Sequence, residues 1–207
     1  MLTIGIAGGS GSGKTTVVKA LEDAFPDNEI SVISQDAYYW NNSHLSPEAK
    51  KKINFDHPDS IEWALLLEHI DKLKKGEPIK MPIYDYAICT RDSKTIKVFP
   101  ARILIVEGIL IYTNQDLLQE LDLKVFVDVE ENDRLERKIN RDIKQRGRTQ
   151  QEAEKHFYDF VEPMHQKFIE PSKNHADFII PEGGENMEAI GLLIDEIKPF
   201  DFRSGLV

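Results

Sequence analysis

The residues best suited to chemistry lie near the N-terminus, in the segment Gly8-Gly9-Ser10-Gly11-Ser12-Gly13-Lys14-Thr15-Thr16. This segment follows a short apolar run and fits the pattern Gly, four residues, Gly, Lys, Thr. Glycines let the backbone curl so that successive N–H groups and the start of a following helix form a concave anion site. Lys14 would reach the β and γ phosphates of a bound ATP, and the Thr15 hydroxyl would bind a Mg²⁺ that bridges them. The segment predicts a nucleoside triphosphate site.

Two acidic residues each follow a short run with strand character. Asp36 comes just after residues 30–34, and Glu107 comes directly after residues 103–106. Ligands of open α/β sheets bind at the carboxyl ends of the strands, and we expect the strand before Asp36 to neighbour the strand before the glycine-rich segment. We predict that Asp36 is a general base, a role worth about 10²- to 10⁴-fold in rate, although a turn or N-cap role explains its position equally well. Glu107 is a candidate magnesium ligand.

Basic residues gather in a predicted helix and just after it. Arg134, Arg137, Lys138 and Arg141 fall within an arc of about 100°, and Leu135, Ile139 and Ile143 occupy a separate arc that we expect to face the core. Arg146 and Arg148 flank Gly147 a few residues later. A solvated cationic face is the ordinary explanation of such a helix. In an acidic chain, the concentration of basic residues favours a phosphate clamp instead, with a mobile lid over residues 141–150 that excludes water.

Aromatic and acidic residues alternate in two further segments, Asn54–Asp59 and Pro82–Tyr86. A carboxylate such as Asp56 can bind vicinal hydroxyls, and aromatic faces can stack on a planar base. These two segments are therefore candidates for a site that binds a sugar and a base. The competing explanation is that Tyr84 and Tyr86 are cross-strand packing partners without a ligand.

The strands and helices that must hold these residues follow the pattern of an α/β fold. Short apolar, β-branched runs at residues 2–7, 30–34, 102–106, 123–127 and 177–180 alternate with helical patterns, which predicts a parallel five-stranded sheet with helices on both faces. Residues 58–75 have helical spacing and end at Gly76, a suitable left-handed C-cap. Two extended runs around Arg91, Asp92 and Ser93 predict an inserted β-hairpin over residues 79–99. No linker or repeat divides residues 1–207, so we expect a single domain.

Composition excludes several classes of protein. The chain has 207 residues, 41% of them hydrophobic and 30% charged, as in ordinary globular proteins. The formal net charge of −10 disfavours nucleic acid as a partner. No apolar run is long enough for a membrane span, and no leader sequence is evident, so we expect a cytoplasmic protein. The one cysteine rules out an internal disulfide. The six histidines lack metal-ligand spacing, and we expect His44, His69, His165 and His175 to be surface or packing residues.

Over nearly its whole length the sequence resembles the uridine kinase (uridine-cytidine kinase) family of P-loop nucleoside kinases. The segments that carry the resemblance occur in the family's order: Gly8 to Thr16, Gln35-Asp36, Asn54 to Asp59, Pro82 to Tyr86, Glu107 to Leu110, Arg141 to Ile143, Arg146 to Arg148, Glu170 to Lys173, and Ala176-Asp177. The resemblance implies phosphorylation of the 5′-hydroxyl of a pyrimidine ribonucleoside, with ATP and Mg²⁺ as cofactors. It also implies a role in nucleotide salvage and a homotetrameric assembly.

The resemblance also implies roles for individual residues. Asp36 would activate the 5′-hydroxyl, and Asp56 would bind the ribose hydroxyls. Arg141, Arg146 and Arg148 would form the lid on the phosphate side. The nucleoside pocket would be lined by Tyr39, Phe55, Tyr84 and Tyr86 together with Cys89, Lys138 and His156, which stand where the family usually has histidine, arginine and glutamine.

These three departures leave the identity of the acceptor open. A thiol is a weak hydrogen-bond partner, and lysine cannot reproduce the planar fork of arginine. A P-loop kinase acting on another small hydroxylated metabolite, of the nicotinamide riboside, pantothenate or ribulose phosphate type, is one alternative. A nucleotide-gated switch without an acceptor is another, although the sequence has no guanine-recognition motif Asn-Lys-x-Asp.

Overall fold

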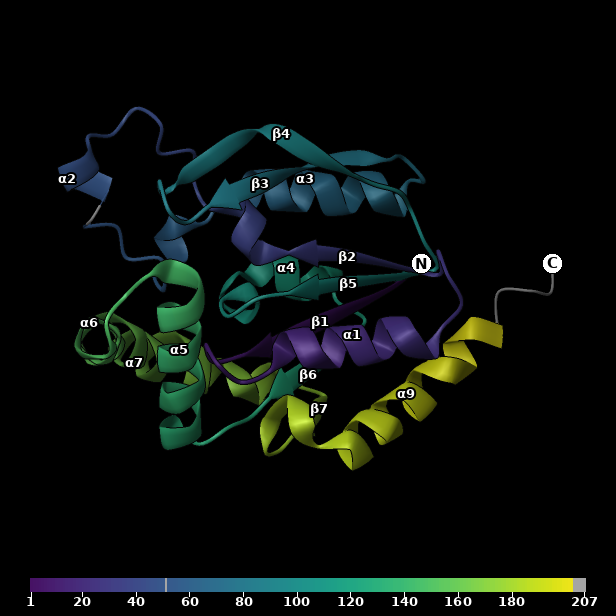
Figure 1. The fold of residues 1–207 in the computed structure, drawn as a ribbon. Coiled ribbons are helices and arrows are strands. Elements are labelled where there is room, and N and C mark those ends of the chain that lie inside the picture. The colour runs from purple at the N-terminus through teal and green to yellow at the C-terminus, as the bar shows by residue number, and fades with distance from the viewer. Residues whose placement is uncertain (51, 203–207) are drawn as a thin grey trace.

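The centre of the protein is a parallel five-stranded sheet with the strand order β2-β5-β1-β6-β7 (Figure 1). The computed structural model describes residues 1–50 and 52–202, and the side chains of all of these except 145, 146, 201 and 202. The strands are β1 (Leu2–Gly8), β2 (Ile30–Ser34), β5 (Ile103–Glu107), β6 (Leu123–Val127) and β7 (Phe178–Ile180). The predicted fold class is confirmed, because each strand lies within about one residue of the run that indicated it.

The order of the strands corrects one expectation. Strand β5 pairs with β1 on one side and with β2 on the other, so that Glu107 lies opposite both Ile6 and Ser34. The prediction that the strand before Asp36 neighbours β1 was therefore wrong. The run Ile103–Val106 is completely buried, and a strand that is apolar on both faces suits the inner position. Glu107 consequently belongs to the strand that adjoins the glycine-rich segment.

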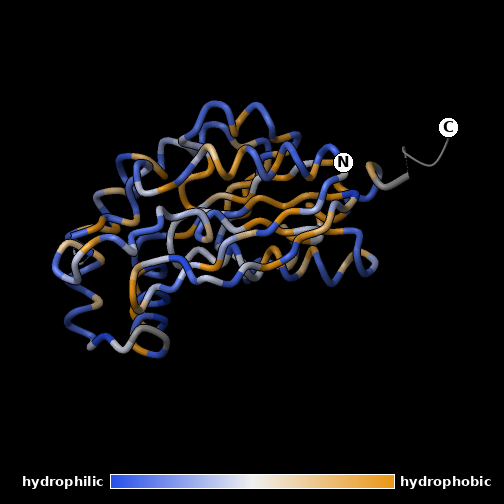
Figure 2. The backbone as a smooth tube through the Cα atoms, turned by 90° about the horizontal axis from the view of Figure 1, so that it is seen from above, coloured by the Kyte–Doolittle hydropathy of each residue, from blue (hydrophilic) through white to orange (hydrophobic). Residues whose placement is uncertain are grey.

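Helices cover both faces of the sheet. Alternate residues of the strands point to opposite sides. On one side Ile4, Ile105 and Val125 pack against α1 (Lys14–Ala24) and α9 (Met187–Phe202). On the other side Leu104 and Phe126 pack in a core with α3 (Trp63–Lys74) and α4 (Gln115–Glu120). Figure 2 shows the resulting layers, with hydrophobic colour along the strands and hydrophilic colour around the outside.

Helix α3 begins later than the sequence pattern indicated and ends where it was expected to. Residues Pro58–Ser60 form a short 3₁₀ turn, and Ile61 then makes an isolated β-bridge with Tyr39 before the helix starts at Trp63. At the other end, Gly76 has a φ of 82°, the left-handed conformation predicted for a C-cap.

The inserted hairpin consists of β3 (Ile79–Asp85) and β4 (Thr90–Val98), which pair antiparallel. It lies beside α3, away from the main sheet (Figure 1). Its turn covers residues 86–89, so the expectation of a turn around Arg91–Ser93 was wrong, and those residues belong to β4. The Asp85 carboxylate accepts hydrogen bonds from the backbone N–H groups of Ala87 (2.8 Å) and Ile88 (3.4 Å), which reverses the chain earlier than expected.

A group of helices covers the end of the sheet to which the carboxyl ends of the strands point (Figure 1). They are α5 (Glu131–Arg146), α6 (Gln150–His156), α7 (Glu162–Met164) and α8 (Glu170–Ser172), with π-helical turns at Phe157–Val161 and His165–Ile169, while the short α2 (Pro47–Lys50) lies in the loop after β2. None of the helices within residues 1–50 and 52–202 combines the length and the apolar character needed to cross a lipid bilayer.

Candidate active site

The glycine-rich segment connects β1 to α1 and curls around the start of that helix. Gly11 and Gly13 have φ values of 86° and 92°, in the left-handed region that favours glycine. A Cβ atom at Gly11 would lie 2.7 Å from the carbonyl oxygen of Arg134, and one at Gly13 would lie 2.8 Å from the backbone nitrogen of Gly184. No side chain caps the N-terminus of α1. The loop therefore needs glycine at these positions, and the start of α1 is left for an anion.

The Lys14 ammonium lies inside this loop. Its Nζ donates hydrogen bonds to the carbonyl oxygens of Gly8 (3.0 Å) and Gly9 (3.1 Å). Burial lowers the pKa of Lys14 from its ordinary value, and this effect exceeds the opposing attraction of the Glu107 and Asp36 carboxylates. The ammonium is a preorganised partner for phosphate oxygens at the mouth of the loop.

The two predicted acids lie at the same edge of the sheet. Asp36 belongs to the 3₁₀ turn Gln35–Tyr38 after β2, and its two carboxylate oxygens accept hydrogen bonds from the Tyr86 hydroxyl (2.5 Å) and the Tyr39 hydroxyl (3.4 Å). Glu107 ends β5 and accepts a hydrogen bond from the Ser34 hydroxyl (2.5 Å). Burial, and then the neighbouring Asp36 carboxylate, raise the pKa of Glu107 above its ordinary value. Two half-buried carboxylates beside the phosphate loop suit a cation.

The predicted aromatic residues form one cluster. The rings of Tyr39, Phe55, Tyr84 and Tyr86 contact one another edge to face, with centroids 5.0 to 6.4 Å apart. Tyr84 is 9% exposed, and burial raises its pKa to about 12. Tyr84 contacts the other three rings and is not among the residues that line the cavity described below. Asp56 is 8% exposed and lines the cavity beside the cluster.

The cationic face of α5 is turned inward, contrary to the expected orientation of that helix. Arg134, Lys138 and Asp142 are at most 2% exposed, whereas Ile143, which we expected to face the core, is 42% exposed. The buried side of α5 faces the phosphate loop and the cavity, where polar partners compensate for the loss of water. Arg141, for example, donates a hydrogen bond from Nη2 to the Ser10 hydroxyl (2.9 Å).

Two of the predicted lid residues can be described. Arg148 donates to the Asp142 carboxylate from Nη1 (2.7 Å), and Arg141 contacts the phosphate loop as above. Arg146 is the last residue of α5, and its side chain lies outside the described residues. Gly147 follows with a φ of 65° and reverses the chain.

A cavity of about 470 Å³ unites these groups. Its wall contains residues from the phosphate loop, the ends of β2 and β5, the hairpin turn, α5 and α6. They are Ser10, Lys14, Thr15, Asp36, Tyr39, Phe55, Asp56, Tyr86, Ala87, Cys89, Glu107, Gly108, Ile109, Lys138, Arg141, Arg148 and His156. Apart from Tyr84, every predicted substrate residue lines this cavity, together with Asp36, Lys14 and both predicted metal ligands, Thr15 and Glu107.

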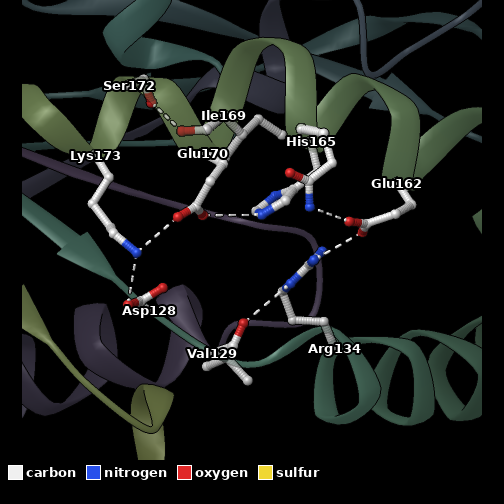
Figure 3. A network of polar contacts seen from close by, with 10 residues as sticks. Asp128, Val129, Arg134, Glu162, His165, Ile169, Glu170, Ser172 and Lys173 are labelled. Atoms are coloured by element: carbon white, nitrogen blue, oxygen red, sulfur yellow. Dashed lines mark hydrogen bonds and ion pairs between the residues drawn. The ribbon is translucent and has the colours of Figure 1, made fainter.

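Sequence reasoning missed a polar network behind the phosphate loop (Figure 3). Arg134 donates to the Glu162 carboxylate (2.8 Å) and to the carbonyl of Val129 (3.2 Å). On the neighbouring π-helical turn, His165 Nε2 lies 3.3 Å from the Glu170 carboxylate, and Glu170 also accepts from Lys173 (2.9 Å).

This network is in close contact with the loop. A Cβ atom at Gly9 would lie 2.8 Å from Arg134 Cδ and 3.0 Å from His165 Cε1. Burial, and then the Arg134 charge, lower the pKa of His165, which keeps the imidazole neutral. Arg134 was predicted to lie near the site as part of the cationic face that it shares with Lys138 on α5, but nothing in the sequence pattern singled out Glu162 or His165.

Comparisons with known proteins place the chain in a family and support the fold. The model of the Phosphoribulokinase / Uridine kinase family matches residues 3–189. A uridine kinase from Geobacillus kaustophilus (strain HTA426) is 48% identical over 197 residues, which cover 95% of this chain and 93% of the relative. A uridine kinase from Clostridium novyi (strain NT) is 45% identical, with 95% of each chain covered. The solved D-glycerate 3-kinase from Cryptococcus neoformans is 18% identical and shares the fold, with a TM-score of 0.59 over 87% of this chain and 86% of that one. The chain therefore belongs to the phosphoribulokinase/uridine kinase family.

Proposed function

We propose that this protein transfers the γ-phosphoryl group of ATP to the 5′-hydroxyl of a pyrimidine ribonucleoside, uridine or cytidine. One observation carries the proposal: Lys14 and Thr15 of the phosphate loop share a single cavity with Asp36, Asp56 and Tyr86. The family membership supports the reaction class, and the names of the relatives in Geobacillus and Clostridium support the nucleoside.

At the phosphate end, the main-chain N–H groups of the loop and the start of α1 bind the β and γ phosphates. The Lys14 ammonium would exchange its carbonyl partners in the loop for phosphate oxygens, and Arg141 would approach them from α5. Thr15 and Glu107 are the residues that would hold Mg²⁺, since a hydroxyl and a carboxylate are ligands this ion accepts. Mg²⁺ held there would supply positive charge that offsets the negative charge of the transferring phosphate group.

At the centre of the cavity, Asp36 acts as the general base. The hydroxyl groups of Tyr86 and Tyr39 hold its carboxylate in one orientation. Asp36 accepts the proton of the 5′-hydroxyl as that oxygen attacks the γ-phosphorus. A P–O bond forms to the nucleoside, the bond to the oxygen bridging the β and γ phosphates breaks, and ADP leaves with that oxygen.

At the nucleoside end, the Asp56 carboxylate accepts hydrogen bonds from the ribose hydroxyls, and the rings of Phe55, Tyr39 and Tyr86 enclose the sugar and base. The backbone N–H of Asp56 donates to the Asn54 side chain (3.0 Å), which steadies this loop. Cys89, Lys138 and His156 line the same region and set the preference for the base.

The test is an acceptor panel with the purified protein, ATP and Mg²⁺. ADP release is measured with uridine, cytidine, nicotinamide riboside, pantothenate and ribulose 5-phosphate, and phosphorus NMR locates the new phosphate ester. The proposal predicts the highest kcat/KM for uridine or cytidine, with the phosphate on the 5′-oxygen. A preference for one of the other acceptors would refute the pyrimidine assignment. ATP turnover that no acceptor stimulates would favour a nucleotide switch.

We further propose that the protein acts in the cytoplasm as one catalytic domain per chain and assembles as a homotetramer. The resemblance to the uridine kinase family supports the assembly. Native mass spectrometry tests it, and a monomer at micromolar concentration would contradict it.

A further inference from the structure

Asp142 is a buried carboxylate on α5 that lies within the predicted lid segment but received no role of its own from the sequence. It is 0% exposed and does not line the cavity. Its Oδ2 atom accepts hydrogen bonds from Lys138 Nζ (2.7 Å), one turn earlier on the helix, and from Arg148 Nη1 (2.7 Å), beyond the end of the helix. A single carboxylate oxygen therefore accepts hydrogen bonds from two cationic side chains.

Both cations stand between this carboxylate and the cavity. Lys138 and Arg148 line the cavity wall, and their side chains are 3% and 30% exposed. Asp142 lies behind these two side chains. Its carboxylate therefore holds them in place and does not contact a ligand in the cavity.

The backbone fixes Arg148 at the same place. Gly147 adopts the left-handed conformation, and the N–H groups of Gly147 and Arg148 both donate to the carbonyl oxygen of Asp142, the latter at 3.3 Å. Among the residues that the structure describes, apart from Gly147 and its chain neighbours, nothing lies within 4 Å of the place that a Cβ at Gly147 would occupy. The chain thus turns back at Gly147 and returns the Arg148 guanidinium to the Asp142 side chain.

A long cationic side chain loses much rotamer freedom when it binds a ligand, and a group that is already held loses less. Charged groups held in advance at the position where charge develops are the strongest electrostatic contributors to catalysis. We propose that Asp142 is a positioning residue that preorganises Arg148, and Lys138 beside it, at the cavity wall so that Arg148 meets the triphosphate without reorganisation. This inference rests on the proposed kinase function.

The first test is a double-mutant cycle of Asp142→Asn and Arg148→Ala. It measures kcat, the KM for ATP and, by calorimetric titration, the Kd of ATP without acceptor. Asp142→Asn alone should lower kcat/KM for ATP about tenfold, and in the Arg148→Ala background it should change kcat/KM little further, because the two residues act as one unit. Asp71→Asn removes the carboxylate of an exposed Asp–Lys pair at the same helical spacing and should change nothing. Independent, multiplicative effects of the two substitutions, or a lower Tm with unchanged kinetics, would overturn the proposal.

A second variant leaves the buried carboxylate intact and protects the test against misfolding. Gly147→Ala strains the left-handed turn and shifts Arg148 away from Asp142, so it should also lower kcat/KM for ATP several-fold. Gly76→Ala is the matched control, because Gly76 has a φ of 82°, equally open surroundings and a position after α3. Equal kinetics for Gly147→Ala and Gly76→Ala would contradict the inference.

The titration separates this inference from the proposed function. If no acceptor in the panel is phosphorylated but Asp142→Asn and Gly147→Ala still weaken ATP binding, the proposed function fails and the positioning role stands. If pyrimidine phosphorylation is found and both variants bind ATP and turn over as the unmodified protein does, the positioning role fails alone.

Discussion

The two ends of the cavity are built in different ways. The phosphate end is built mainly from one contiguous segment, Gly8 to Thr16, whose main-chain groups are shaped by glycines, with Glu107, Arg141 and Arg148 added from outside it. The nucleoside end is assembled from side chains of the turn after β2, the loop at Asp56, the hairpin turn, α5 and α6. Main-chain N–H groups are the same for every sequence that can adopt the loop, whereas side chains change with each substitution. Reaction class is therefore built into the first end, and substrate preference into the second.

Substitution of Asp36, the residue between the two ends of the cavity, should cause the largest loss of activity. Asp36→Asn removes the general base while keeping its shape, so kcat should fall by about 10²- to 10⁴-fold. The Kd of the nucleoside, measured by titration, should change little, because the loss is confined to the transition state. Asp23→Asn on the exposed side of α1 serves as the control. Turnover close to that of the unmodified protein would remove Asp36 from its proposed role.

A substitution at the nucleoside end should weaken nucleoside binding and leave ATP binding unchanged. Asp56→Asn weakens charge-assisted hydrogen bonds to the ribose, worth about 1.5–3 kcal/mol, so the KM for uridine should rise about 10- to 100-fold. The Kd of ATP should stay the same. Steady-state kinetics and a separate ATP titration check this prediction, and parallel losses for ATP and uridine would show that the two ends are not separable.

Cys89 offers a smaller and more specific change at the same end. Its φ of 50° lies in the left-handed region, which histidine tolerates better than most residues do. Cys89→His replaces a weak donor by an imidazole, and a neutral hydrogen bond of about 0.5–1.5 kcal/mol should lower the KM for the preferred nucleoside about two- to tenfold. Cys89→Ala is the matched comparison, and an unchanged KM in Cys89→His would argue that this position does not face the base.

The smallest effect concerns stability at the phosphate end. Because burial and Asp36 raise the pKa of Glu107 in the folded protein, its ionised form opposes folding. The penalty is absent where Glu107 is protonated in both states and grows as the pH rises through its folded pKa. Glu107→Gln should therefore raise Tm more at about pH 8 than at about pH 5, while it lowers kinase activity. Thermal unfolding at both pH values tests this, with the exposed Glu196→Gln as control. An increase in Tm that is larger at about pH 5 than at about pH 8 would contradict this prediction.

The contrast between a phosphate end built from consecutive residues and a nucleoside end built from distant segments also explains which features the sequence could predict. The phosphate loop, the five strands and the acids at the strand ends follow from local patterns, because each depends on a few consecutive residues. The strand order could not be read in this way, since β5 inserts between β1 and β2 through pairing distant in the chain.

The nucleoside end and its supports depend on contacts between distant segments. The resemblance supplied Tyr39, Phe55 and Cys89, but Tyr84 lies behind the cavity because of how the hairpin packs. The orientation of α5 was mistaken because hydrophobic periodicity assumes an apolar core, whereas the buried side of α5 is polar and makes hydrogen bonds to Ser10 and Glu162 and, within the helix, to Asp142.

The central claim is that a triphosphate held by the loop lies in line with an alcohol activated by Asp36. A crystal structure with a non-hydrolysable ATP analogue, Mg²⁺ and uridine measures this directly. The account predicts the 5′-oxygen about 2.6–3.2 Å from an Asp36 carboxylate oxygen and opposite the bridging oxygen at the γ-phosphorus. A 5′-oxygen that points away from Asp36, or a nucleoside bound outside the cavity, would contradict it.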